Sequence, residues 1–171
     1  MKLYIKMAIV LTAISLLSAF ALSQVFLWAA PIIQANKELE VRNSVFEVVE
    51  GAKNFDKYDD KDFRYFKVYS ENDEIIGYAF INVGNGFQGK ITVIAGVNSD
   101  LTIIKAIKVV DHSETPGLGD IIVKEWYTEQ FKNLVVNPNI GWVKEGAQKK
   151  ENEIYAKTGA TISSKSVVAI L

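Results

Sequence analysis

Residues 65–110 read YFKVYSENDEIIGYAFINVGNGFQGKITVIAGVNSDLTIIKAIKVV, and most of the architecture follows from this segment. Aromatic and β-branched residues fill four runs separated by polar or glycine-containing turns, which predicts strands at 65–69, 75–83, 90–97 and 101–110. Because no helix is expected between these strands, they are predicted to form an antiparallel sheet. Helices added on one side of the sheet make the predicted fold class α+β.

The turn between the second and third predicted strands contains Gly84, Gly86 and Gly89 with the spacing G-x-G-x-x-G. A dinucleotide-binding fingerprint requires a helix directly after the glycines, whereas a strand is predicted here, so that function is disfavoured. A protein kinase is excluded, because the chain is short and has neither the H-R-D nor the D-F-G motif. The plain alternative is a glycine-rich connection between two strands.

The segment from Asp111 to Glu114 contains His112, the only histidine. Consecutive residues of an extended chain point to alternate sides, so Asp111, His112 and Ser113 cannot converge as a hydrolase triad. A partial metal site at His112 is a less favoured alternative. We expect His112 to end a strand and Glu114 to open a loop.

The loop that follows, Thr115 to Asp120, contains Pro116, whose φ is fixed, and the two glycines Gly117 and Gly119 around Leu118. A rigid loop of small residues can bring backbone N–H groups and one apolar side chain against a flat ring. This loop is therefore a candidate binding element.

Thr161 precedes the last predicted helix, whose apolar positions are Ile162, Val167, Val168 and Leu171. It is expected at or near the helix N-cap, after a turn that Gly159 permits. A helix start carries unpaired N–H groups and a positive dipole end, so it stabilises a phosphate. An ordinary threonine cap without a ligand is the alternative. The sequence ends about ten residues after Thr161, which leaves open whether this helix is cut short.

Thr158-Gly159-Ala160-Thr161 resembles the S/T-G-A-T flavinylation motif of the FMN-binding domain family shared by RnfG and NqrC. These proteins are membrane-anchored flavoprotein subunits of the ion-translocating Rnf and NADH:quinone reductase complexes. The segment from Glu114 to Gly119, E-T-P-G-L-G, resembles a second motif of the same family. Two motifs in the family's order make the resemblance specific, and the chain length favours RnfG.

The resemblance implies that a flavin transferase joins the phosphate of FMN to Thr161. It also implies that the isoalloxazine ring lies against the 114–119 loop, and that the glycine-rich turn permits close backbone approach. The implied cofactor-binding residues are Thr158, Gly159, Ala160, Thr161, Glu114, Thr115, Pro116, Gly117, Leu118, Gly119, Gly86 and Gly89. No catalytic residue and no metal ligand is implied. Tyr155 departs from the family pattern, because an aspartate is often found at its position.

Downstream of the loop, residues 121–133 are predicted to form an amphipathic helix with a buried side made of Ile122, Trp126 and Phe131. Two short strands are predicted at 140–145 and 153–156. They lead into the threonine motif.

Upstream of the strands, residues 33–49 are predicted to form a helix with an apolar face made of Ala35, Leu39, Phe46 and Val49. Residues 51–62 mix aspartates with lysines. Such acidic spacing raises a calcium-binding hypothesis, but the glycine and terminal glutamate of an EF-hand loop are absent. A solvated linker is the favoured interpretation.

Residues 7–30 carry no charged side chain. About 24 residues at about 1.5 Å each make about 36 Å of helix, enough to cross a hydrocarbon core of about 30 Å. Lys2 and Lys6 precede this segment, which predicts a cytoplasmic tail and export of the chain after Pro31. The alternative is a signal peptide cleaved after Ala21, although the apolar run continues to Trp28. Both interpretations place the remaining domain outside the cytoplasm.

Composition excludes several classes of protein. The 171 residues include 19 basic and 20 acidic side chains and no basic cluster, which argues against nucleic-acid binding. The absence of cysteine excludes disulfides, cysteine-ligated iron–sulfur clusters and zinc–thiolate sites. If the protein transfers electrons, an organic cofactor must carry them.

The predicted layout is a cytoplasmic tail (1–6), a transmembrane helix (7–30), a helical connector and linker (31–62) and an extracytoplasmic FMN-binding domain (63–171). The resemblance implies a single-pass inner-membrane subunit of an Rnf-type oxidoreductase that relays electrons through covalent FMN. Its implied partners are the other membrane and redox subunits and the flavin transferase. Within the family the alternative is the NqrC subunit. Outside it, the alternative is a non-catalytic, membrane-anchored binding or assembly module.

Overall fold

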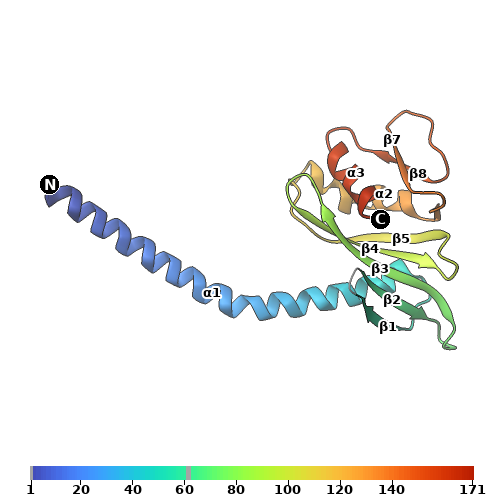
Figure 1. Cartoon of the computed structure of the whole chain (residues 1–171), viewed down its shortest axis with the longest axis horizontal. Coiled ribbons are helices and arrows are strands. Elements are labelled where there is room, and N and C mark those ends of the chain that lie inside the picture. Colours follow the sequence, from blue (N-terminus) through green and yellow to red (C-terminus); the bar gives the residue numbers. More distant parts are fainter. Residues whose placement is uncertain (1, 61–62) are drawn as a thin grey trace. The chain divides into compact units, whose positions relative to one another are not determined.

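The computed structural model of the chain describes residues 2–60 and 63–171 (Figure 1). Met1, at the start of the predicted tail, and Lys61 and Asp62, at the end of the predicted linker, lie outside the described residues. The structure divides into two compact units, one that ends at Glu40 and one that comprises Val41–Leu171. The predicted FMN-binding domain, 63–171, lies within the second unit, and its bounds stay a prediction.

The first unit consists of most of helix α1, Lys2–Val48. This helix continues through Pro31 and so joins the predicted membrane span to the helix predicted after it. Its 47 residues correspond to about 70 Å. Within residues 2–60 and 63–171 it is the single helix that is long and apolar enough to cross a membrane. Large apolar side chains from Leu3 to Ile33 are exposed along it.

The second unit is built on a six-stranded antiparallel sheet with the strand order β1-β2-β3-β4-β5-β6. The strands are β1 Asn54–Asp59, β2 Arg64–Tyr69, β3 Ile75–Asn85, β4 Lys90–Asn98, β5 Ile103–His112 and β6 Leu134–Val135. The four predicted strands correspond to β2 through β5. The prediction of an antiparallel sheet in an α+β fold is therefore confirmed.

Strand β1 lies in the segment that was predicted to be a solvated linker, and that prediction is wrong for residues 54–59. The strand pairs in register with β2, from Asn54 opposite Tyr69 to Asp59 opposite Arg64. Backbone hydrogen bonds hold this edge strand while nearly all of its side chains remain in solvent. Its polar composition therefore gave no sign of the pairing.

The end of α1 covers one face of the sheet (Figure 1). Val45, Val48 and Val49 are at most 2% exposed and pack against the sheet residues Phe66, Val68, Ala79 and Ile94. The helix approaches β4 closely because Gly96 has no side chain. A Cβ at this position would lie 2.1 Å from the carbonyl oxygen of Val48.

The buried stripe of α1 differs from the apolar face predicted for residues 33–49. Val49 is buried as predicted and Phe46 is half-buried, whereas Ala35 and Leu39 are exposed. Burial begins only in the last turns of the helix, because those are the turns that contact the sheet.

The opposite face of the sheet is covered by short helical turns, one longer helix and a two-stranded parallel sheet (Figure 1). These elements are η1 Gly119–Val123, α2 Glu125–Thr128, η2 Glu129–Phe131, β7 Gly141–Lys144, β8 Glu153–Ala156 and α3 Thr161–Ile170. Strands β7 and β8 confirm the two short strands predicted in this region.

The single amphipathic helix predicted over residues 121–133 is wrong. The segment forms η1, α2 and η2, and the extended backbone of Lys124 (φ −74°, ψ 140°) separates the first two. Ile122 and Phe131 are buried as predicted, but Trp126 is 47% exposed and Tyr127 is fully buried instead. The interruption at Lys124 shifts the helical phase, so residue 127 rather than 126 points into the core.

Candidate functional site

Three segments that are distant in the sequence meet at the start of α3. They are the turn between β3 and β4 (86–89), the loop after β5 (114–119) and residues 159–163. A cavity of about 290 Å³ lies among them, lined by Phe87, Glu114, Thr115, Leu118, Gly119, Gly159, Ala160, Thr161, Ile162 and Ser163.

Most residues predicted for the site from sequence line this cavity. Gly86, Gly89, Pro116, Gly117 and Thr158 belong to the same three segments or adjoin them but are not among the lining residues. The lining also includes three residues that were not predicted: Phe87, Ile162 and Ser163. Phe87 lies inside the glycine-rich turn and the other two follow the threonine motif, so proximity to a motif was the available signal. Contact of all these residues with a cofactor stays a prediction.

Helix α3 begins at Thr161, with Gly159 at φ +88° and Ala160 in the N-cap position before it. Thr161 is thus the first helical residue, next to the N-cap. Its hydroxyl donates a hydrogen bond to the carbonyl oxygen of Lys157 (3.2 Å). Because the first N–H groups of a helix have no partner within the helix, this end of the cavity favours an anion.

Glu114 connects two of the three segments through its carboxylate, which belongs to a residue only 4% exposed. The backbone N–H of Gln88 donates to Oε1 (3.0 Å) and the hydroxyl of Ser163 donates to Oε2. Burial by itself raises the pKa of Glu114, but the hydrogen bonds from Ser163 and from backbone N–H groups of the 87–89 turn outweigh it. The net effect holds its pKa below the ordinary value, so Glu114 is an anion at neutral pH.

Two glycines make room for this carboxylate. A Cβ at Gly86 would lie 2.3 Å from Oε1 of Glu114, and a Cβ at Gly119 would lie 2.6 Å from Oε2. Heavy atoms do not approach so closely without displacement. Gly86 and Gly119 therefore allow the turn and the loop to close around the Glu114 side chain.

The loop after Glu114 is held to the glycine-rich turn by Thr115. Its hydroxyl donates a hydrogen bond to Oε1 of the Gln88 side chain (2.5 Å), and its carbonyl oxygen accepts from the N–H of Leu118 (3.1 Å). Gly117 has a φ of +76°, a conformation that favours glycine. The resulting tight turn presents Leu118, which is 56% exposed, at the edge of the cavity.

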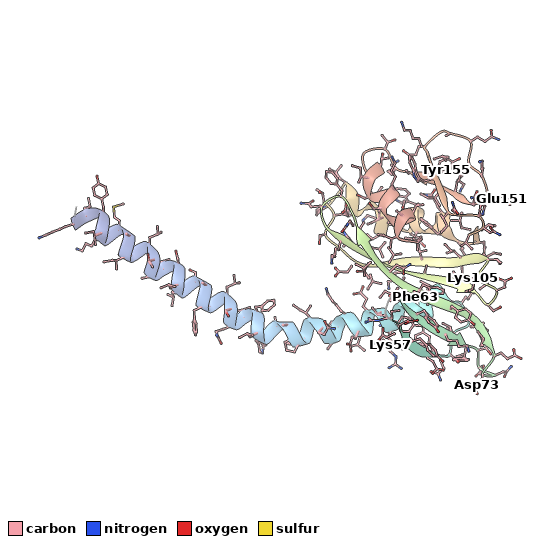
Figure 2. The ribbon with its side chains drawn as sticks, in the orientation of Figure 1. Lys57, Phe63, Asp73, Lys105, Glu151 and Tyr155 are labelled. Atoms are coloured by element: carbon pink, nitrogen blue, oxygen red, sulfur yellow. The ribbon has the colours of Figure 1, made fainter. Side chains whose placement is uncertain are left out.

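The turn before α3 is held from the other side by Glu145, which was not predicted from sequence. Its carboxylate accepts from the ammonium of Lys157 (2.7 Å) and from the backbone N–H of Thr158 (3.2 Å). The hydrogen bond from Lys157, followed by that from Thr158, lowers the pKa of Glu145. Tyr155, the departure from the family pattern, lies on β8 (Figure 2). The ammonium of Lys149 lies over its ring, 5.3 Å from the centroid.

The side chains around the cavity fit a flavin mononucleotide in their chemistry. Phe87 and Ile162 are 66% and 54% exposed and, with Leu118, surround the cavity with apolar surface. The start of α3 favours a phosphate. The cavity is near the lower end of the range of about 300–1,000 Å³ for small-molecule pockets. It would hold part of a nucleotide, and the remainder would lie against the exposed apolar side chains.

His112 is the last residue of β5, as predicted, and its Nδ1 accepts a hydrogen bond from the backbone N–H of Glu114 (3.2 Å). Across the ranges 2–60 and 63–171, no three His, Asp or Glu side chains are grouped so that they could hold a metal ion. The hydrogen bond from the Glu114 N–H to His112 fixes the backbone where β5 ends and the 114–119 loop begins.

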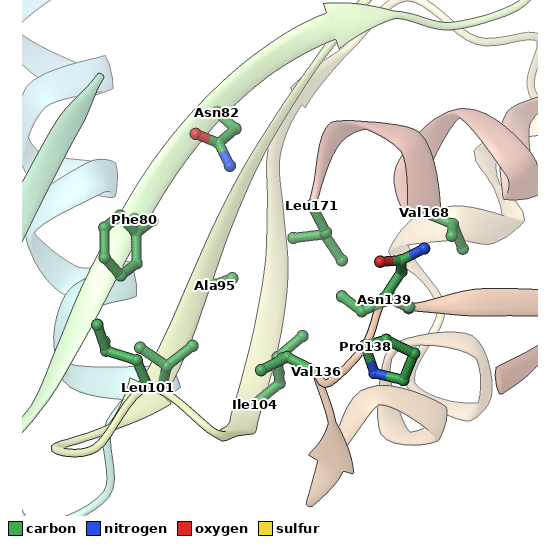
Figure 3. Close-up of a pocket in the computed structure, with 12 residues that line it drawn as sticks. Phe80, Asn82, Ala95, Leu101, Ile104, Val136, Pro138, Asn139, Val168 and Leu171 are labelled. Atoms are coloured by element: carbon green, nitrogen blue, oxygen red, sulfur yellow. The ribbon is translucent and has the colours of Figure 1, made fainter. Parts of the chain in front are cut away.

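A second cavity of about 490 Å³ lies between the sheet and the end of α3 (Figure 3). Its lining is mainly apolar and includes Phe80, Ile104, Val136, Val168 and Leu171. It shares no lining residue with the cavity at the start of α3. The two cavities are therefore separate.

Residues 86–171 match a family model described as the FMN-binding domain. The matched span begins at Gly86, in the turn between β3 and β4, and contains all three segments that line the cavity at the start of α3.

Two curated proteins are similar over most of the chain. The first is the G subunit of the ion-translocating oxidoreductase complex of Methanosarcina acetivorans, 35% identical over 138 residues, which cover 81% of this chain and 70% of the relative. The second is the G subunit of the Na(+)-translocating ferredoxin:NAD(+) oxidoreductase complex of Acetobacterium woodii. It is 30% identical over 186 residues, with coverage of 98% of this chain and 88% of the relative.

A solved structure shares the fold. It is the crystal structure of the C subunit of the Na(+)-translocating NADH-quinone reductase from Parabacteroides distasonis, with a TM-score of 0.65 and 18% identity. The superposition covers 81% of this chain and 89% of that chain. At this identity the likeness is one of fold.

Proposed function

The chain belongs to the FMN-binding domain family, and on that premise we propose that it is the flavin-carrying G subunit of an Rnf-type, ion-translocating ferredoxin:NAD(+) oxidoreductase. It acts there as one redox subunit among several and is inactive alone. The two curated relatives at 30% and 35% identity support this role. The C subunit of the quinone reductase is less similar in sequence, at 18% identity.

The position of Thr161 carries this proposal. It is the first residue of α3, and it lines the cavity where helix N–H groups favour a phosphate. We infer that a flavin transferase forms a phosphoester at this residue. Oγ1 of Thr161 bonds to the phosphorus of FMN, the hydroxyl loses its proton, and an activated flavin nucleotide donor loses its leaving group. The neighbouring Ser163 and Ser164 are at most 2% exposed, which supports Thr161 as the acceptor.

When bound, FMN supplies one-electron and two-electron transfer. The residues of this chain bind and orient it. The start of α3 stabilises the phosphate, while Phe87, Leu118 and Ile162 offer apolar contact to the faces of a flat ring. A covalent link keeps the cofactor from being lost outside the cell. The exposure of these apolar side chains leaves the site open to an electron-transfer partner.

Helix α1 supports attachment to the membrane, because its apolar part is long enough to span the hydrocarbon core. Lys2 and Lys6 precede that part, which favours a cytoplasmic N-terminus and an FMN-binding domain on the outer side of the inner membrane. A span without charged side chains offers no route for ions. Ion translocation therefore belongs to other membrane subunits of the complex.

The proposal is tested by co-expressing the full chain with a flavin transferase and denaturing the membrane-extracted protein. The expected result is yellow colour and an FMN-sized mass increase that survive denaturation. Thr161→Ala should abolish the adduct and Thr161→Ser should keep it. Thr102→Ala is the control and should keep the adduct, because Thr102 is an exposed threonine just before β5 and lies outside the three segments that line the cavity. Covalent flavin in Thr161→Ala would place the attachment elsewhere, and no flavin in any variant would favour a binding or assembly module.

A further inference from the structure

We propose that Glu114 is a positioning residue of the flavin site, whose buried carboxylate ties the 86–89 turn to the first turn of α3 and thereby orients Thr161. This inference rests on the proposed function. Its structural part can be tested on the protein without flavin, so the two proposals can fail separately.

The two oxygens of Glu114 serve different segments. Oε1 accepts from the backbone N–H of Gln88, in the turn between β3 and β4, and Oε2 accepts from the hydroxyl of Ser163, in α3. Glu114 itself begins the 114–119 loop. A single side chain therefore joins all three segments that form the cavity.

The clasp formed by Glu114, Gln88 and Ser163 is closely packed. Glu114 is 4% exposed and Ser163 is 2% exposed. A buried carboxylate is costly unless donors satisfy it, and here N–H and O–H groups do so. The backbone of Gly86 and of Gly119 lies close to the carboxylate, since a Cβ at either position would clash with one of its oxygens.

The bond to Ser163 fixes the first turn of α3 against Glu114. Thr161 and Ser163 belong to that turn, and both line the cavity. Holding Ser163 therefore fixes the backbone position from which Thr161 lines the cavity. Ser163 is 2% exposed whereas Thr161 is half-buried, which supports Thr161 as the acceptor.

The charge of Glu114 has a second consequence. Glu114 lines the cavity, and a buried negative charge disfavours the addition of an electron to a flavin bound beside it. Removal of the charge is therefore expected to shift the midpoint potential of the bound flavin to a more positive value. A purely structural contact would not produce such a shift.

The test compares Glu114→Gln, which removes the charge, with Ser163→Ala, which removes one donor and keeps the charge. Glu151→Gln is the matched control, because Glu151 is an exposed carboxylate that does not line the cavity. In the protein without flavin, hydrogen–deuterium exchange in Glu114→Gln should rise about tenfold or more at both 86–89 and 164–167, where the α3 amides have helix hydrogen bonds. Ser163→Ala should raise exchange at 164–167 and leave 86–89 near the wild-type rate.

In the flavin-loaded full chain, peptide mapping should show less adduct at Thr161 in Glu114→Gln, and spectroelectrochemistry should show a more positive midpoint potential. Ser163→Ala should reduce the adduct and leave the potential near that of the wild type. Unchanged exchange, adduct and potential in Glu114→Gln would overturn the inference while the proposed function stands. If Glu114→Gln does not fold, Ser163→Ala decides, because unchanged exchange at 164–167 would also overturn the inference. If the wild-type chain carried no flavin, the proposed function would be contradicted. The exchange measurement would still test whether Glu114 holds Gln88 and Ser163 in place.

Discussion

The hydroxyl of Ser163 donates a hydrogen bond to Oε2 of Glu114, although 49 positions separate the two residues in the chain. Each residue belongs to or adjoins one of the two sequence motifs, and their contact brings those motifs to one cavity. The backbone N–H of Gln88 adds the glycine-rich turn to the same carboxylate. The candidate site thus depends on an interaction that neither motif contains by itself.

Acid should weaken the domain through Glu114. Its folded-state pKa lies below its unfolded-state value of about 4.3, so its contribution to stability is present above that pH and is lost as the pH falls through the folded-state pKa. At pH 7, Glu114→Gln should unfold with a free energy lower by about 2 kcal/mol than the wild type. Urea unfolding between pH 7 and pH 3 should show this gap narrowing below about pH 4. A gap that is constant with pH would contradict the assignment of an anionic Glu114.

Gly119→Ala should disturb the site more than Gly117→Ala. A Cβ at Gly119 meets Oε2 of Glu114 at 2.6 Å, so this variant should lose about 1–3 kcal/mol of stability and much of its flavin. Gly117 has open space around its Cβ position. Gly117→Ala should therefore lose only about 1–2 kcal/mol of stability, which is what a non-glycine residue loses at a φ of +76°. Urea unfolding and flavin content measure both effects. Full flavin content in Gly119→Ala would refute the crowding argument.

Tyr127 should matter more for stability than its neighbour Trp126. Tyr127 is fully buried and its hydroxyl donates to the carbonyl oxygen of Ser164 (3.0 Å), so Tyr127→Phe should cost about 1 kcal/mol. Tyr127→Ala should cost about 3–5 kcal/mol through the cavity that it leaves. Trp126→Ala should cost less than about 1 kcal/mol, because this side chain is 47% exposed. If Tyr127→Ala and Trp126→Ala lost equal unfolding free energy in urea, the assignment of Tyr127 rather than Trp126 to the core would be wrong.

The last turns of α1 should be part of the folded domain. Val48→Ala removes buried methyl groups that pack against the sheet and should cost about 2 kcal/mol in the detergent-solubilised full chain. Leu39→Ala is the control on the same helix, because Leu39 is 56% exposed, and it should change stability by less than about 0.5 kcal/mol. If Val48→Ala were as stable as Leu39→Ala, the domain would begin after α1.

The apolar N-terminal segment should remain attached to the mature protein. The intact mass and N-terminal sequence of membrane-extracted protein should then start near Met1. A mature chain that begins at Leu22 would show that the segment is a cleaved signal peptide, since that is the residue after the Ala19-Phe20-Ala21 site. The measurement does not depend on flavin, so it tests the anchor alone.

Strands β2 to β5 could be recognised in the sequence by itself, because alternating apolar residues and turn-forming residues are local signals. The same holds for the turn at Gly159 and the start of α3 at Thr161, where one glycine and one helix pattern suffice. The uncharged segment 7–30 is equally local, because its length and composition alone predict a membrane span.

Other features arose only when distant parts of the chain met. The polar strand β1 pairs with β2 along its whole length, and contacts such as the Phe55–Phe66 and Tyr58–Tyr65 ring pairs exist only after that pairing. Tyr127, and not the predicted Trp126, is buried in the core because the helix is interrupted at Lys124. Packing against the sheet stabilises this interruption. The burial and charge of Glu114 exist because Gln88 and Ser163 converge on it from remote segments. The periodicity of apolar residues depends only on residues a few positions apart. Burial and hydrogen-bond partners depend on how the whole chain folds. The candidate site is formed by such tertiary contacts, so the sequence alone could not reveal it.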